Sequence, residues 1–233
     1  MDAPRPRRAE YAESTRRALL DSATRLFAEK GFAATSLDEV AADARVTKGA
    51  VYHHFSNKQA LFEAAAERLE AEVASDLLTA ASEAPSAWVG AVAGMDRFLE
   101  RLLDPLYRRL AFEEGPAVMG FANWWAHGER VVLGVIRGML DALDAEGLVD
   151  HDDLDAVSEL LFGAAVACAL AVTRSEQPHA EIQRFRAAMM RLVAGLRPLQ
   201  PPVPAAVVPS GAAPRTAPPT PGVGLPGFEP GTS

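Results

Sequence analysis

Hydrophobic residues recur at helical spacing nearly throughout the chain, up to about residue 197, and strand-like alternation nowhere runs for long. The first apolar stripe consists of Leu19, Ala23, Leu26 and Phe27. It ends at Gly31, where a helix C-terminus favours a left-handed residue, and Phe32 follows where such an end usually makes a hydrophobic contact. The pattern predicts an all-α protein that begins with a set of short helices.

Three more helix starts follow within the next thirty residues. Ser36 and Glu39 have the spacing of a capping box, which predicts a second helix there. A third helix is predicted from about Thr47. Ser56 and Gln59 repeat the capping-box spacing, which predicts a fourth helix capped by Ser56 that runs to about residue 82.

The remainder divides into longer helices and a tail of different composition. Helices are predicted over residues 86–103, 105–112, 117–146, 152–174 and 179–197. Gly115-Pro116, Gly147 and Gln177-Pro178 mark the breaks between them. From residue 198 to residue 233, 11 of 36 positions are proline and 5 are glycine, which predicts a disordered tail with no assigned function.

Composition fits a folded intracellular protein. With 49% hydrophobic residues the chain can form a core, and its one cysteine, Cys168, excludes an internal disulfide framework. We expect Cys168 to be an inert core residue. The N-terminus lacks the apolar region of a secretory signal, and the longest apolar run, residues 160–172, is short for a membrane span. A cytoplasmic location without membrane contact is therefore expected.

Charge is distributed unevenly along the chain, although the net charge is −8. Residues 1–60 carry ten lysines and arginines against eight acidic residues, whereas the remaining residues carry 13 against 23. Arg5, Arg7 and Arg8 lie at the very start. A slightly basic beginning on an acidic body indicates a polyanionic partner for the first part only.

The stretch VTKGAVYHHF, residues 46–55, has the composition of a DNA-reading helix. The two short helices joined by a turn of about three residues predict a helix-turn-helix, whose second helix presents its N-terminal residues to bases. Thr47 caps this helix, Lys48 supplies a cation, and Gly49 and Ala50 keep its face small. Polar tips that can donate to phosphates are supplied by Tyr52, His53 and His54. Val51 and Phe55 are expected to pack on Leu37 and Val40.

Other functions find less support in the residues. Adjacent histidines on a helix point about 100° apart, so His53 and His54 do not share a metal easily, and we expect neither a metal nor a cofactor. A Gly-rich phosphate loop, a nucleophile elbow and metal-spaced ligands are all missing from the sequence, so an enzyme is not expected. A helical ligand- or partner-binding protein that no longer reads DNA, and a transcriptional activator, stay open as alternatives.

Residues 16–62 resemble the DNA-binding head of the TetR family of transcriptional regulators. Four elements carry the resemblance in order: FAEKGF, SLDEVA, KGAVYHHF and KQALF. It implies a homodimer that binds a palindromic operator in double-stranded DNA and is released by a small-molecule inducer, as a repressor in preference to an activator. The implied domains are a flexible basic arm (1–13), the helix-turn-helix (14–60), a ligand-binding and dimerisation domain (61–197) and the tail (198–233).

The resemblance also implies roles for residues of the head. Thr35 and Ser36 would hold a phosphate, Thr47 to Ala50 would face bases, and the predicted phosphate clamps are Tyr52, His53, His54 and Lys58. Arg45 stands where family members commonly have glycine, so it would be strained if the position needs a positive φ, or it would touch a phosphate. The three N-terminal arginines would reach into a minor groove.

In the body, the resemblance implies an inducer pocket and a dimer interface formed by the last two helices. The pocket candidates are Trp88, Met95, Phe98, Phe112, Glu113, Met119, Phe121, Trp124, Trp125 and His127. The interface candidates lie on apolar stripes of residues 152–174 and 179–197 and are Leu161, Ala165, Ala169, Ile182, Phe185, Met189 and Leu192.

Overall fold

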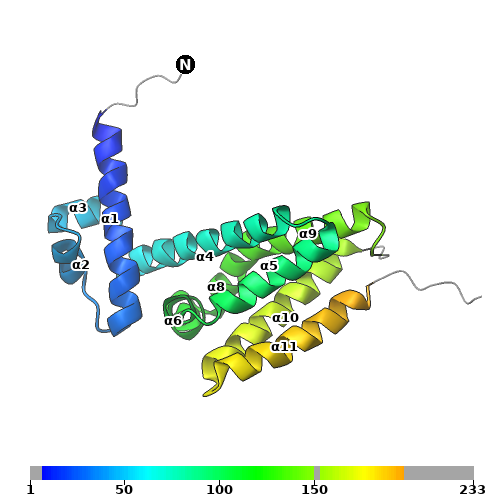
Figure 1. Ribbon diagram of the computed structural model, residues 1–233. Helices are drawn as coiled ribbons and strands as arrows, with labels where there is room; N and C mark the ends of the chain where they lie inside the picture. The colour runs from blue at the N-terminus through cyan, green and yellow to red at the C-terminus, as the bar shows by residue number, and fades with distance from the viewer. Residues whose placement is uncertain (1–6, 150–152, 197–233) are drawn as a thin grey trace, which may run out of the picture. The chain divides into compact units, whose positions relative to one another are not determined.

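The computed structural model describes residues 7–149 and 153–196, and these residues form helices without a strand (Figure 1). The predicted all-α class is confirmed. The helices are α1 (Arg7–Lys30), α2 (Leu37–Asp43), α3 (Lys48–His54), α4 (Lys58–Ser82), α5 (Ala87–Arg101), α6 (Pro105–Arg108), α7 (Gly115–Met119), α8 (Phe121–Gly128), α9 (Gly134–Ala145), α10 (Leu154–Arg174) and α11 (Pro178–Ala194), with π-helical segments η1 (Arg109–Glu114) and η2 (Glu129–Leu133). Arg5 and the predicted tail lie outside the described residues.

Capping residues set the ends of the first helices as the sequence predicts. The Ser36 hydroxyl accepts the Glu39 N–H at 3.2 Å, and the Glu39 carboxylate accepts the Ser36 N–H at 2.9 Å, which completes a capping box. Lys30, together with Ser36, lowers the pKa of Glu39 to about 2. Gly31 ends α1 with a φ of 85°. Phe32 then packs its ring 5.8 Å from the ring of Phe27.

Two predicted boundaries are wrong. The cap of α4 is Asn57, whose side chain accepts the Ala60 N–H at 2.8 Å, and not Ser56. Asparagine and serine cap helices about equally well, so the sequence does not separate the two neighbours. The first helix begins at Arg7 and not after a flexible arm of 13 residues. Good helix formers fill positions 7–30 without a glycine or proline, so α1 extends over them.

The predicted break at Gly115-Pro116 is also wrong. Pro116 stands in the first turn of α7, which directly follows the π-helical segment η1, and the chain stays helical through it. The interruption comes instead at Gly120, with a φ of 77°. The helix predicted over residues 117–146 is therefore divided into the end of α7, then α8, η2 and α9.

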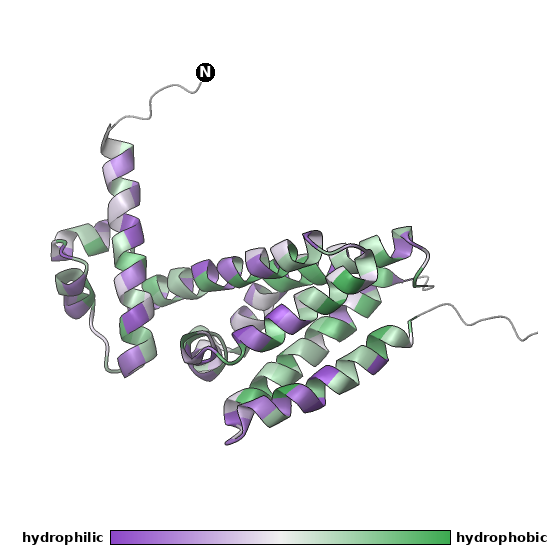
Figure 2. Cartoon of the chain, in the orientation of Figure 1, coloured by the Kyte–Doolittle hydropathy of each residue, from purple (hydrophilic) through white to green (hydrophobic). Residues whose placement is uncertain are grey.

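The body is a layered bundle in which α4 and α5 pack along each other and α9, α10 and α11 complete the packing (Figure 1). Figure 2 shows that α10 is apolar along most of its length, whereas α4 alternates between apolar and polar residues. By length and mean hydropathy, 1.9, α10 alone among the helices of the described residues could cross a membrane, but it packs against α9 and α11. Cys168 on this helix is a buried core residue, as predicted, and burial raises the pKa of its thiol to about 12.

Candidate DNA-binding surface, ligand cavity and dimer face

Helix α3 has one buried and one exposed face. Val51 and Phe55 are at most 5% exposed and join the core that also contains Val40, as predicted. The exposed face presents Thr47, Lys48, Gly49, Tyr52 and His53. Thr47 caps the helix by accepting the Ala50 N–H at 3.2 Å. The predicted recognition residues thus lie together on the surface, with small residues at the N-terminal end of the helix.

Lys48 is held by a neighbouring carboxylate in the DNA-free protein. Its Nζ lies 2.8 Å from Asp38 Oδ1, and Asp38 raises the pKa of Lys48. Both side chains are more than half exposed, so the pair contributes little and Lys48 can exchange it for a DNA contact.

Two predicted phosphate ligands serve the fold instead. Thr35 is 1% exposed, and its hydroxyl donates to the carbonyls of Gly31 (2.8 Å) and Leu26 (3.2 Å). Lys58 donates to the carbonyls of Phe32 (2.7 Å) and Thr35 (2.9 Å). Both predictions are corrected, because the carbonyls at the end of α1 and in the following loop need donors that these two side chains supply.

The remaining head residues follow the sequence more closely. Arg45 has a φ of 57°, the only positive φ of a non-glycine residue in the described part of the chain, and its side chain is exposed. The position therefore carries the expected strain. Ser36 is exposed at the start of α2. His54 is half-buried against His53, and desolvation lowers its pKa.

Side chains of the body form hydrogen bonds with the backbone at the end of α1. Arg109 of η1 donates to the Ala28 carbonyl at 2.8 Å, and Glu114 accepts the N–H of Phe32. Arg109 and Glu114 also pair with each other at 3.3 Å. The helix-turn-helix is thus connected to the body by these contacts as well as through α4.

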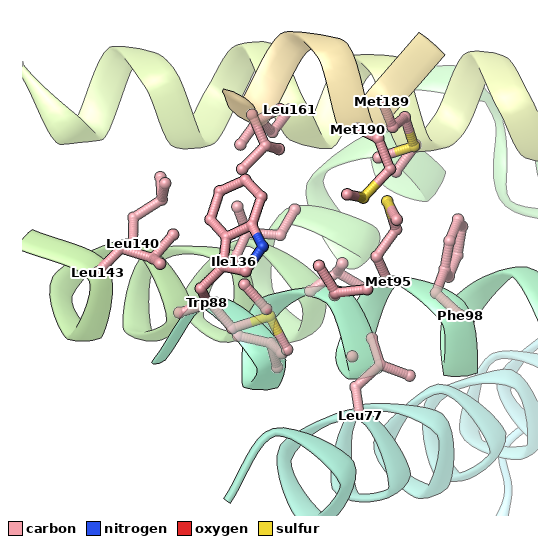
Figure 3. Close-up of a pocket in the computed structure, with 18 residues that line it drawn as sticks. Leu77, Trp88, Met95, Phe98, Ile136, Leu140, Leu143, Leu161, Met189 and Met190 are labelled. Carbon is pink, nitrogen blue, oxygen red and sulfur yellow. The ribbon is translucent and has the colours of Figure 1, made fainter. Parts of the chain in front are cut away.

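An apolar chamber of about 90 Å³ lies among α4, α5, α9, α10 and α11. Figure 3 shows Trp88, Met95 and Phe98 on one side of it and Met189 and Met190 on the other. Its other lining residues are Leu77, Ala91, Val92, Gly94, Val132, Val135, Ile136, Met139, Leu140, Leu143, Leu161, Ala165 and Val193. Apart from the Trp88 indole, these side chains carry no nitrogen or oxygen, so the chamber favours apolar ligand surface.

A smaller aromatic chamber of about 30 Å³ adjoins it, and Phe98, Val132 and Ala165 line both. Its own lining residues are Glu70, Tyr107, Phe112, Trp124, Trp125, Gly128, Phe162 and Val166. Six of the predicted pocket residues therefore line one chamber or the other: Trp88, Met95, Phe98, Phe112, Trp124 and Trp125.

The other four pocket candidates are corrected. Glu113 is exposed and Phe121 is 65% exposed, whereas Met119 is a core residue and His127 is buried beside Glu70. Sequence reasoning also missed the methionines and aliphatic residues of α9 and α11. Their apolar spacing is that of any core helix, so no local signal distinguishes a cavity wall from close packing.

The predicted dimer stripe is largely used inside the protomer. Ala165, Ala169, Ile182 and Met189 are at most 9% exposed, so these four predictions are wrong. Leu161 and Phe185 are half-buried, and Leu161 lines the apolar chamber. Leu192, at 55% exposed, is free for a partner, and so is Leu160 at 75%, which the sequence did not single out.

Sequence and structure comparisons agree with the geometry. The family description "Bacterial regulatory proteins, tetR family" matches residues 19–65, and "Tetracyclin repressor-like, C-terminal domain" matches residues 88–196. The chain is 29% identical over 158 residues to the Tn10 TetC protein of Escherichia coli, covering 66% of this chain and 78% of TetC. It is also 29% identical over 167 residues to the probable acrEF/envCD operon repressor of Escherichia coli, covering 66% and 73%.

Among solved structures, a TetR-family transcriptional regulator from Pectobacterium atrosepticum superposes with a TM-score of 0.71 at 30% identity. The match covers 83% of this chain and 98% of that protein. The helix-turn-helix with its exposed α3 and the helical body are thus shared along nearly the whole length of a homologue. The chain belongs to the TetR family of transcriptional regulators, in which ligand-responsive repression is typical.

Proposed function

We propose that two copies of this chain bind a palindromic operator in the cytoplasm through α3, and that a small, mainly apolar ligand in the apolar chamber releases them as inducer. The observation that carries the proposal is the exposed face of α3, where Lys48, Tyr52 and His53 surround the bare backbone at Gly49. A face this small at its N-terminal end lets the helix approach base edges closely. The intact face favours a DNA-reading regulator over a binding protein that has lost this activity.

Burial assigns the contacts to fewer residues than the sequence suggested. The residues assigned to contact DNA bases or the adjacent DNA backbone are Thr47, Lys48, Gly49 and the half-buried Ala50. Phosphate contacts are assigned to the exposed side chains of Ser36, Arg45, Tyr52 and His53, and to the half-buried His54. These contacts orient the helix, whereas Lys48 and the small residues supply sequence discrimination.

The position of the apolar chamber supports its coupling to DNA. Leu77 lines it from α4, the helix that is separated from α3 by three residues. A ligand that pushes α4 moves the end of α4 that holds α3. Since two recognition helices must fit major grooves about 34 Å apart, a small displacement in each copy lowers operator affinity.

We assign the contact with a second copy of the chain to the outward face of α10 and α11. Leu160 and Ala167 on α10, and Ala187, Ala188 and Leu192 on α11, are exposed there at helical spacing. Small side chains between the two leucines allow the helices of a partner to approach closely.

The test is fluorescence anisotropy of labelled DNA from beside the gene, at two salt concentrations with nonspecific competitor. The double variant Lys48→Ala/Tyr52→Ala is expected to lose about 100-fold or more in affinity, since two contacts of ~1–3 kcal/mol disappear. The matched control is Arg97→Ala on α5, an exposed cation that also pairs with a carboxylate (Glu100, 3.2 Å). Unchanged binding by the double variant, with helicity and mass intact, would refute the assignment of α3.

A further inference from the structure

The aromatic chamber differs from the apolar chamber in one respect, which is a buried carboxylate. Glu70 of α4 is 6% exposed and lines the aromatic chamber together with Phe98 and five further aromatic rings. These belong to Tyr107, Phe112, Trp124, Trp125 and Phe162. A carboxylate removed from water in such surroundings is costly unless a cation or hydrogen-bond donors meet it.

The protein compensates this carboxylate only in part. His127 Nε2 lies 2.8 Å from Glu70 Oε2, and neither of these two buried atoms has another hydrogen-bond partner. On the other side of the ring, Arg130 Nη2 lies 2.9 Å from His127 Nδ1. A guanidinium can only donate, so this contact requires an unprotonated Nδ1 and therefore a neutral imidazole. Glu70 opposes this by raising the pKa of His127.

This arrangement allows an external cation to replace the histidine. When a positive group reaches Glu70, the imidazole stays neutral and keeps the hydrogen bond that Arg130 donates to its Nδ1. No unpaired charge is then left in the core, which is the usual cost of exchanging partners at a buried ion pair. The carboxylate also has a second oxygen, beyond the one that faces His127, to accept from a ligand.

The rings around Glu70 favour a cation over an anion. Trp125 and Phe162 lie edge to face with centroids 5.0 Å apart, as do Tyr107 and Phe112 at 5.5 Å. Aromatic faces attract ammonium groups, and the attraction grows when the cation is desolvated. The two indole N–H groups that could serve an anion are already committed, since Trp124 donates to the Ala111 carbonyl (2.6 Å) and Trp125 to Glu129 (2.7 Å).

We infer that the ligand of this regulator is an amphipathic organic amine, whose apolar part occupies the apolar chamber and whose ammonium group lies against Glu70 in the aromatic chamber. Phe98, Val132 and Ala165 line both chambers, so the two lie next to each other, and the inference requires that one molecule occupy both. The inference rests on the proposed function and adds to it the chemical class of the ligand and the residue that selects it.

The test compares three molecules of nearly the same shape and different charge: 4-phenylbutylamine, 4-phenylbutanol and 4-phenylbutyrate. Their dissociation constants are measured on the full-length protein at neutral pH by isothermal titration calorimetry. The amine is expected to bind at least about tenfold more tightly than the alcohol, and the carboxylate most weakly. Glu70→Gln should bring the amine and the alcohol to within about threefold of each other, because it removes the charge and keeps the shape.

Glu72→Gln is the matched control, because Glu72 lies on the same helix with its side chain 56% exposed. It should keep the ratio of the wild-type protein. Equal affinities for amine and alcohol in the wild-type protein would overturn the inference, and so would selectivity that persists in Glu70→Gln or the failure of all three molecules to bind. The wild-type comparison decides the matter even if Glu70→Gln fails to fold.

The same titrations separate this inference from the proposed function. If the alcohol binds as tightly as the amine and releases operator DNA in the anisotropy assay, the apolar chamber is the inducer site and only the role of Glu70 is wrong. If the amine binds with the expected selectivity but leaves operator affinity unchanged, Glu70 selects the ligand and the proposed coupling to DNA is wrong.

Discussion

Replacing Gly49 with alanine is expected to change the stability of the free protein and its operator affinity in opposite directions. Gly49 lies in the first turn of α3, and a Cβ built there would meet nothing nearer than Thr47 Oγ1, at 3.9 Å. The free protein thus has room for the methyl group. Alanine restricts the unfolded chain and favours the helix, so Gly49→Ala should stabilise the protein by about 0.5 kcal/mol, or about 1–2 °C in Tm.

The same methyl group is expected to weaken operator binding. In the proposed complex the backbone at Gly49 approaches the bases, and a methyl group there occupies the space of van der Waals contact. We expect a loss of at least about tenfold in operator affinity, or about 1.4 kcal/mol. A variant that is more stable and yet binds DNA less well cannot be explained by misfolding.

Gly138→Ala in α9 is the matched control, because Gly138 is also helical and exposed and a Cβ there meets nothing within 4 Å. It should gain a similar stability and keep operator affinity. Thermal unfolding followed by circular dichroism gives the first quantity, and anisotropy with labelled operator gives the second. Unchanged affinity in Gly49→Ala would refute the close approach of α3 to DNA, and a lower Tm would show that its surroundings are not open.

Three further changes probe the body and its link to the head. Gly31→Ala should lower the free energy of unfolding, measured in urea titrations, by about 2–3 kcal/mol. The reasons are that Gly31 has a φ of 85° and that the new Cβ would lie 2.6 Å from Glu114 Oε1. An unchanged free energy of unfolding would contradict this prediction. Glu70 raises the pKa of His127, so the ion pair stabilises the folded protein. This stabilisation is complete below pH 6.5, the ordinary pKa of histidine, and is lost as the pH rises through the raised pKa. The Tm advantage of the wild-type protein over His127→Gln should therefore be larger at about pH 6 than at about pH 8.5, and a reversed order would be inconsistent with this pair. Leu160→Glu, at a 75% exposed position, should yield monomers in light scattering without loss of helicity; a persistent dimer would place the interface elsewhere.

Local signals made the head predictable. Gly31, the capping box of Ser36 and Glu39, and the Thr47 cap each depend on a few neighbouring residues, and the structure has all three. Apolar spacing also placed Val51 and Phe55 in the core. The errors at Asn57 and Pro116 arose where two neighbouring residues can serve the same role, or where a helix breaker stands in the one turn that tolerates it.

Contacts across the fold decided the rest. In the sequence, Thr35 and Lys58 look like surface polar residues. In the structure, both side chains donate hydrogen bonds to carbonyls at the end of α1 and in the loop that follows it. Ile182 and Met189 form an apolar stripe that fits a dimer interface equally well, until the packing of α11 on its own protomer buries them. The meeting of Glu70 and His127 joins residues on α4 and α8 that no spacing relates.

The sequence by itself determined the family, the helices of the head and the exposed face of α3, because capping and helical periodicity act within a few residues. Only the tertiary structure decided which apolar residues enclose a chamber, which face is left for a partner, and that a carboxylate lies among aromatic rings. The physical reason is that burial depends on which helices meet, and that choice is made by the packing of the whole chain.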